Sequence, residues 1–112
     1  MIDKKKWDKI TAAHVLKRDK KCYTCGSKVG LQCGHYIPRA HMETRFSLVN
    51  CHAQCTNCNS TLSGNLKIYR EKLIEEYGET VVKDLEKAKY APKKILESDI
   101  VRIFYGVSDT PK

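Results

Sequence analysis

Two pairs of cysteines, each separated by two residues, are the clearest chemical signal in the chain. Cys22 and Cys25 form the first pair, and Cys55 and Cys58 form the second. Zn²⁺ binds four thiolates in a tetrahedron, and two such pairs supply all four ligands. The spacing therefore predicts a structural zinc site, one ion per chain, with no open position. The alternatives are that the spacing arose by chance or that one Cys-x-x-Cys motif is redox-active. A redox-active motif would not require the second one.

A histidine and two asparagines follow in order along this frame. They are His35, Asn50 and Asn59, the last directly after Cys58. A neutral histidine can take a proton from water, and an amide carbonyl can accept from its other ring nitrogen. An amide oxygen also suits a hard cation. These residues fit phosphodiester hydrolysis, with His35 as general base, Asn50 orienting it and Asn59 binding Mg²⁺ or Mn²⁺.

Each of these residues also has a simpler structural interpretation. His35 could be a packed residue at the end of a strand, and Asn59 could form hydrogen bonds inside the cysteine knuckle. The remaining cysteines, Cys33 and Cys51, are interpreted as small buried hydrophobic residues. The zinc frame, with both asparagines in register, favours the catalytic interpretation of His35.

Four short segments resemble one known family. They are G-H-Y at Gly34–Tyr36, R-F at Arg45–Phe46, N-x-H-x-Q-C-x-x-C-N at Asn50–Asn59 and S-G-N-L-x-x-Y-R at Ser63–Arg70. Over roughly residues 14–90 the chain resembles the NinG (Rap) family of lambdoid phages, within the HNH or ββα-metal nucleases. The resemblance implies a metal-dependent endonuclease that cuts branched DNA recombination intermediates, such as Holliday junctions and D-loops.

One position departs from the wider HNH pattern. Many HNH sites place an acidic metal ligand just before the catalytic histidine, and here that residue is Gly34. His52, just past Asn50, and His41 are the candidates for a second ligand. Cys33 is a poor ligand for Mg²⁺. His52 and His41 are equally compatible with surface or DNA contacts, so the sequence leaves this ligand open.

The remaining pattern predicts an α+β fold around a small ββα-metal core, in a single domain over residues 1–112. We expect a basic N-terminal region at 1–21, the zinc-stapled core at 22–65 and C-terminal helices at 66–105. The expected elements are a helix over 3–20 capped by Asp3, strands at 31–36 and 46–49, a helix from Cys51 to Gly64, amphipathic helices over 66–77 and 79–90, and a third starting at Pro92. The tail from Gly106 is expected to fray.

Charge points to a polyanionic partner. The net charge is +8, from 21 Lys and Arg against 13 Asp and Glu, which favours nucleic acid over a merely soluble basic protein. Candidate DNA contacts near the proposed site are Arg39, His41, Arg45, Lys67 and Arg70. No helix resembles a major-groove reader, so we expect recognition of backbone and shape. The alternative is that Lys67 and Arg70 only belong to the solvent-exposed face of their helix and do not contact DNA.

Compartment and assembly follow from simpler observations. The N-terminus leads into no apolar run and no segment is apolar enough to span a bilayer. We therefore expect a cytoplasmic protein, in the host cell if it is phage-encoded, with no membrane partner. A DNA junction with two-fold symmetry matches the two-fold symmetry of a homodimer, so a homodimer is the expected assembly. Two other functions compete: a non-catalytic zinc-dependent DNA-binding module, and an HNH nuclease of restriction or homing type acting on linear duplex.

Overall fold

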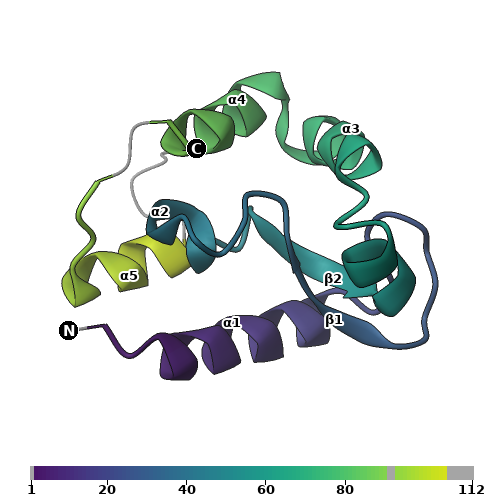
Figure 1. The fold of residues 1–112 in the computed structure, drawn as a ribbon, viewed down its shortest axis with the longest axis horizontal. Coiled ribbons are helices and arrows are strands. Elements are labelled where there is room, and N and C mark those ends of the chain that lie inside the picture. The colour runs from purple at the N-terminus through teal and green to yellow at the C-terminus, as the bar shows by residue number, and fades with distance from the viewer. Residues whose placement is uncertain (1, 91–92, 106–112) are drawn as a thin grey trace.

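The computed structural model describes residues 2–90 and 93–105 and combines helices with one small sheet (Figure 1). The elements in chain order are α1 (Lys4–Arg18), β1 (Leu31–His35), α2 (Met42–Arg45), β2 (Cys51–Cys55), the π-helical turn η1 (Asn57–Thr61), α3 (Leu66–Tyr77), α4 (Glu79–Ala88) and α5 (Glu97–Tyr105). The predicted α+β class is confirmed. No helix in the described ranges is long and apolar enough to cross a membrane.

The sheet is an antiparallel hairpin whose two faces meet different helices. Leu31 pairs with Cys55 at one end, and His35 pairs with Cys51 at the other. Successive side chains of a strand point to opposite faces. His35 and Cys51 therefore share the face that packs on α1, whereas their neighbour His52 lies on the face covered by α3. Figure 1 shows α1 below the sheet and α3 and α4 above it.

Helix α1 starts and ends close to its predicted bounds. Asp3 caps it as expected, because its carboxylate accepts a hydrogen bond from the Lys6 backbone amide at 3.1 Å. Val15 is fully buried against Cys51 and Ala53 of β2. The apolar residues Ile10 and Leu16 are each 37% exposed. The helix thus contacts the sheet along a narrow stripe.

The second strand does not lie where the sequence predicted it. Residues 46–49 form no strand, and the preceding segment folds into the short helix α2. The return strand is Cys51–Cys55, where we predicted the start of a helix, and only η1 is helical before Gly64. All five residues of β2 are buried, because α1 covers one face and α3 the other. A strand buried on both faces shows no polar alternation, which explains the error.

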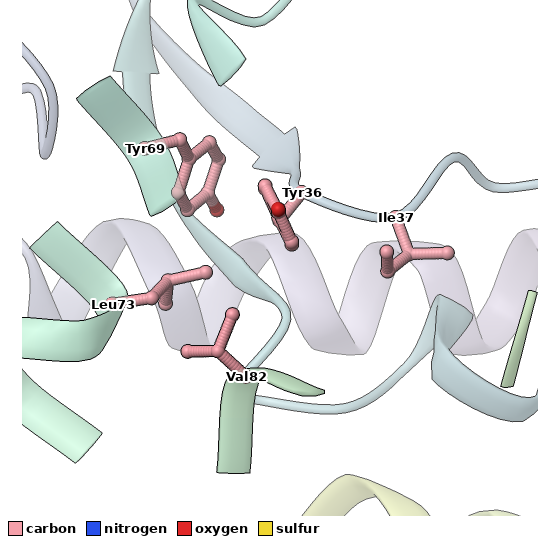
Figure 2. Close-up of a cluster of buried hydrophobic side chains, with 5 residues drawn as sticks. All are labelled: Tyr36, Ile37, Tyr69, Leu73 and Val82. Atoms are coloured by element: carbon pink, nitrogen blue, oxygen red, sulfur yellow. The ribbon is translucent and has the colours of Figure 1, made fainter. Parts of the chain in front are cut away.

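Helices α3 and α4 close over the hairpin and form the main apolar core. Figure 2 shows Tyr69 and Leu73 of α3 facing Val82 of α4, with Tyr36 and Ile37 from the segment after β1. Gly78 separates the two helices as predicted, with a φ of 94° that favours glycine. Val81, next to Val82 on α4, is 37% exposed and so contributes little to this core.

The last described helix, α5, begins at Glu97. Ile95 and Leu96, which we expected on this helix, precede it, and the Asp99 side chain accepts a hydrogen bond from the Leu96 amide at 2.9 Å. Ile100 and Phe104 are buried. The predicted start at Pro92 and the predicted frayed tail from Gly106 lie outside the described residues.

Candidate active site

The four paired cysteines come together at one end of the hairpin. Their sulfur atoms all lie within 4.8 Å of one another, and the Sγ atoms of Cys25 and Cys55 are 3.6 Å apart. Sulfurs on a tetrahedral zinc with bonds of about 2.3 Å are about 3.8 Å apart. The predicted cluster of Cys22, Cys25, Cys55 and Cys58 is therefore confirmed as a group that could hold a metal ion such as zinc.

Hydrogen bonds prepare this cluster for a metal. The Cys58 amide donates to the Cys55 sulfur at 3.4 Å, and Asn65 donates to the Cys58 sulfur at 3.7 Å. Burial raises the pKa of Cys22, but the Thr24 hydroxyl and nearby backbone amides outweigh it and lower that pKa to about 6. A thiolate at neutral pH is the form that binds metal.

His35 ends β1 at the opposite end of the hairpin. Its Nε2 lies 2.8 Å from the carbonyl oxygen of Arg45. A carbonyl only accepts, so Nε2 carries the proton and Nδ1 carries the lone pair. Burial is the main cause that lowers the pKa of His35 below its ordinary value, and the positive charge of Arg39 adds to it. The imidazole is therefore neutral at pH 7 and can accept a proton.

Asn50 does not contact His35 in the way we expected. Its side-chain oxygen accepts from the Ile37 amide at 2.8 Å, and its side-chain nitrogen donates to the carbonyls of Ile37 and Thr44 at 3.0 and 3.2 Å. The side chain is fully buried. The expected hydrogen bond from His35 to Asn50 is wrong: the Arg45 carbonyl orients the imidazole, and Asn50 holds together the loop that carries this carbonyl.

A cavity of about 670 Å³ brings the other site residues together. It is lined by His35 and Cys33 from β1, by Asp8 from α1, by Arg39 from the following loop and by Asn59 from η1. Asn59 donates its amide hydrogen to the Gln32 side-chain oxygen at 2.8 Å, which leaves its own oxygen as an acceptor. The structure thus places three of the predicted residues, His35, Arg39 and Asn59, around one cleft.

His52 is not part of this cleft. It is almost fully buried on the α3 face, where its ring stacks on that of Tyr23 with 3.8 Å between the ring centroids. Its two ring nitrogens lie 3.3 Å from the Tyr69 hydroxyl and 3.2 Å from the Tyr77 hydroxyl. Burial lowers the pKa of His52 to about 3. The suggested role of His52 as a ligand of the catalytic metal is wrong, because strand alternation directs it away from His35.

Gly34 has a packing role on the same face. A Cβ atom at this position would lie 2.0 Å from the side-chain oxygen of Gln54. Gln54 is fully buried and donates to the Thr24 hydroxyl and the Gly64 carbonyl at 3.1 and 2.8 Å. An acidic side chain at 34 would therefore collide with Gln54 and would not point into the cleft.

Two of the predicted DNA-binding arginines have partners within the chain. Arg45 binds the Asp8 carboxylate through two hydrogen bonds of 3.0 and 2.6 Å. Arg70 binds Glu86 at 2.7 and 3.3 Å, and Glu86 also accepts from the Tyr36 hydroxyl. These two pairs tie α1 to α2, and α3 to α4.

The other predicted DNA contacts are more accessible. The Arg39 side chain is 61% exposed and lies 3.6 Å from Asp8 at the cleft. Lys67 is exposed on α3, and His41 precedes α2 outside the residues that line the cleft. Arg39 is therefore the predicted cation best placed to meet a ligand in the cleft.

Sequence reasoning missed Asp8. Burial raises its pKa, but the hydrogen bonds and charge of Arg45, and then the charge of Arg39, outweigh this and lower it. Asp8 is thus an anion that holds Arg45, whose carbonyl holds His35. An isolated acid on a lysine-rich helix was the only signal in the sequence, and it does not indicate which face meets the cleft.

Comparisons with known proteins agree on one family. The family model described as Bacteriophage Lambda NinG protein matches residues 4–107. Protein ninG of Escherichia phage lambda is 40% identical over 72 residues, which cover 62% of this chain and 35% of that protein. Protein ninG of Salmonella phage P22 is 42% identical over 72 residues, covering 62% and 36%. The match spans about a third of the relatives' length. No solved structure matches the chain.

Proposed function

This chain belongs to the NinG family, and from that premise and the cleft around His35 we propose that it is a metal-dependent, structure-selective DNA endonuclease with an HNH core. In this proposal it hydrolyses phosphodiester bonds in branched recombination intermediates such as Holliday junctions and D-loops. The observation that carries the proposal is His35, a neutral imidazole fixed by one carbonyl at a cleft that Arg39 and Asn59 also line.

His35 supplies the base. The Arg45 carbonyl holds the Nε2 proton, so the Nδ1 lone pair is the one that can accept a proton from an attacking water. Asn50 keeps the loop between β1 and β2 in place through three hydrogen bonds. Asn50 is therefore a positioning residue that acts through the backbone, and Arg45 is positioned in turn by Asp8.

Arg39 and Asn59 face the phosphate in this proposal. The guanidinium of Arg39 can clamp a phosphate oxygen through charge-assisted hydrogen bonds, because its contact with Asp8 is long and its side chain is largely exposed. The wider positive charge of the chain, +8 overall, attracts the DNA backbone without reading bases. Lys67, exposed on α3, is a further backbone contact in this proposal.

A catalytic Mg²⁺ or Mn²⁺ ion finds few protein ligands here. Within residues 2–90 and 93–105, the two clusters of potential ligands both contain cysteines, and the Asp8 carboxylate is held by Arg45. Mg²⁺ often keeps several waters and takes other oxygens from substrate phosphates. The cleft fits such an ion with the Asn59 oxygen plus DNA phosphate oxygens. When bound, the ion would stabilise the charge that builds on the phosphate.

The sparse ligand set supports a second candidate function. A zinc-dependent DNA-binding module needs the four-cysteine cluster and the basic surface but no second metal. An HNH nuclease that cuts linear duplex remains the third candidate. A homodimer that places one cleft on each side of a junction is part of the proposal for branched DNA.

Cleavage of a labelled four-way junction, next to a linear duplex of the same sequence, distinguishes these functions. With zinc retained at the four-cysteine cluster, the proposal expects junction cleavage that requires added Mg²⁺ or Mn²⁺. Equal cleavage of the linear duplex would leave a nuclease without branch selectivity. Tight binding of both DNAs with no cleavage under any metal would replace the proposal by the binding module.

A further inference from the structure

We propose that Cys33, His35 and Cys51 form a second metal site, suited to a thiophilic ion such as Zn²⁺. Their ligand atoms all lie within 4.8 Å of one another. The site is separate from the four-cysteine cluster, because Leu31 and Cys55 pair at one end of the hairpin and His35 and Cys51 at the other. The short sheet would then carry a metal ion at each end.

Strand register creates this cluster. His35 and Cys51 are direct cross-strand partners, and Cys33 lies two residues before His35 on the same face. Cys33 pairs with Ala53, which is buried on the same face. The three ligands are therefore fixed by the hairpin itself and not by mobile loops, which reduces the rearrangement that metal binding requires.

The donor set selects the kind of ion. Two thiolates and one imidazole prefer zinc and similar soft or borderline ions over Mg²⁺. Three protein ligands leave a fourth coordination position for water or another ligand, unlike the closed four-cysteine cluster. Cys33 and His35 both line the cavity of about 670 Å³, so that fourth ligand would come from the cleft.

A single carbonyl group lies beside two of the three ligands. The Arg45 oxygen accepts from His35 Nε2 at 2.8 Å and, while Cys51 is a thiol, from its S–H at 3.5 Å. Zinc would displace the Cys51 proton and leave the hydrogen bond from His35 in place. Metal-bound histidines commonly donate their other ring N–H to a carbonyl, which fixes the ring and the tautomer. Asp8 and Asn50 hold this loop in place, so the cluster already has the supporting contacts that a metal site needs.

The site has a consequence that rests on the proposed function. A neutral imidazole has one nitrogen lone pair, since its other nitrogen carries the proton. An ion bound to His35 takes the lone pair that the proposed hydrolysis needs for water. Zinc at this site would therefore inhibit the nuclease, and its removal would restore the base.

Counting metal ions on the full chain tests the site without DNA. The protein is reduced, dialysed against micromolar free Zn²⁺ and analysed for zinc per chain. We expect two ions for wild type, one for Cys33→Ser and one for Cys51→Ser. His14→Ala, which removes an exposed α1 histidine outside both clusters, should retain two. With Co²⁺ in place of zinc, thiolate charge-transfer absorption should be about half as large again in wild type as in the cysteine variants, since two thiolates join four.

The same measurement can overturn the proposal. One zinc per chain in reduced wild type would show that Cys33 and Cys51 are only packed thiols. Two ions retained in both cysteine variants would place the second ion elsewhere. Cys33 is only half-buried, so Cys33→Ser keeps the test decisive if Cys51→Ser fails to fold. Because no DNA is present, failure of the nuclease proposal leaves this result unaffected.

Discussion

Two histidines on neighbouring strands have opposite roles because they lie on opposite faces of the hairpin. His35 borders the cleft, and one carbonyl fixes its tautomer. His52 is enclosed by Tyr23, Tyr69 and Tyr77. Both are neutral at pH 7, since burial is the main cause that lowers each pKa. Only His35 can reach a substrate, so His52 stabilises the fold and His35 is the candidate for chemistry.

His52 makes the stability of the fold depend on pH. Its folded pKa of about 3 lies below the ordinary value of 6.5. The unfolded chain therefore binds more protons between these values, and the contribution is complete above pH 6.5 and is lost as the pH falls. Between pH 7 and pH 5 this single group should lower the free energy of unfolding by about 2 kcal/mol.

Urea unfolding at pH 7, 6 and 5, for wild type and His52→Gln in excess zinc, measures this contribution. Both proteins share the pH dependence of the zinc ligands, so the difference between them isolates His52. The stability advantage of wild type should shrink as the pH falls. An advantage that stays constant from pH 7 to pH 5 would contradict the assignment of His52 as a buried neutral side chain.

The β1–β2 hairpin is tightly packed on the face that meets α3, around Gly34. The Tyr69 hydroxyl donates to the Gly34 carbonyl at 2.8 Å, and Gln54 fills the volume where a side chain at 34 would lie. Gly34 is therefore required by the close approach of Gln54. The absence of an acid before His35 has the same physical cause, since no carboxylate fits there.

Gly34→Ala should lower the free energy of unfolding by about 1–3 kcal/mol, because the new methyl group overpacks a filled site. The double variant Gly34→Ala/Gln54→Ala lacks the side chain that blocks position 34. Its loss of stability should therefore be smaller than the sum of the losses in the two single variants. Chemical denaturation of all four proteins gives the coupling between the two positions. Strictly additive losses would show that Gln54 does not exclude a side chain at 34.

The four-cysteine cluster joins the two ends of the core segment, so its loss should affect the whole fold. Cys55 is both the end of β2 and a ligand of the cluster. Metal binding energy is folding energy in small metal-stapled domains. Cys55→Ser should therefore lose its tightly bound zinc and its cooperative thermal transition, followed by circular dichroism and metal analysis. A variant that keeps its zinc and melts like wild type would refute the four-cysteine assignment.

The sequence predicted those elements whose pattern is local. Helices α1, α3 and α4 lie within their predicted ranges, β1 lies within the predicted strand at 31–36, and the paired cysteines indicate one cluster. Strand β2 was missed because burial on both faces removes the alternation that marks a strand. The contacts of Asn50 and the role of Asp8 were also missed, since they depend on how a loop folds against α1.

Across the whole molecule, charge is divided between cations that hold the fold and cations that remain available. Arg45, with a side chain only 15% exposed, pairs with Asp8. Arg39 is the largely exposed cation at the same cleft. In the proposed complex with DNA, only the available cations would displace counterions from the phosphates.

Arg39→Ala and Arg45→Ala should therefore have different effects. Arg39→Ala should weaken DNA binding and reduce the slope of log affinity against log salt by about one, with stability changed by less than about 0.5 kcal/mol. Arg45→Ala should lower the free energy of unfolding by about 1–3 kcal/mol, because it leaves Asp8 without its main partner. Fluorescence anisotropy over a salt series and urea unfolding give both quantities. Equal loss of stability in the two variants would contradict this division.

We propose that His35 is the base of a DNA-cleaving site. The most direct test is the rate of four-way junction cleavage by His35→Ala and wild type, with DNA affinity measured in the same buffer. We predict that cleavage falls by about 10²–10⁴-fold, as expected for loss of a general base, while affinity and four-cysteine zinc content are retained. Wild-type cleavage that survives unchanged in folded His35→Ala would contradict the account.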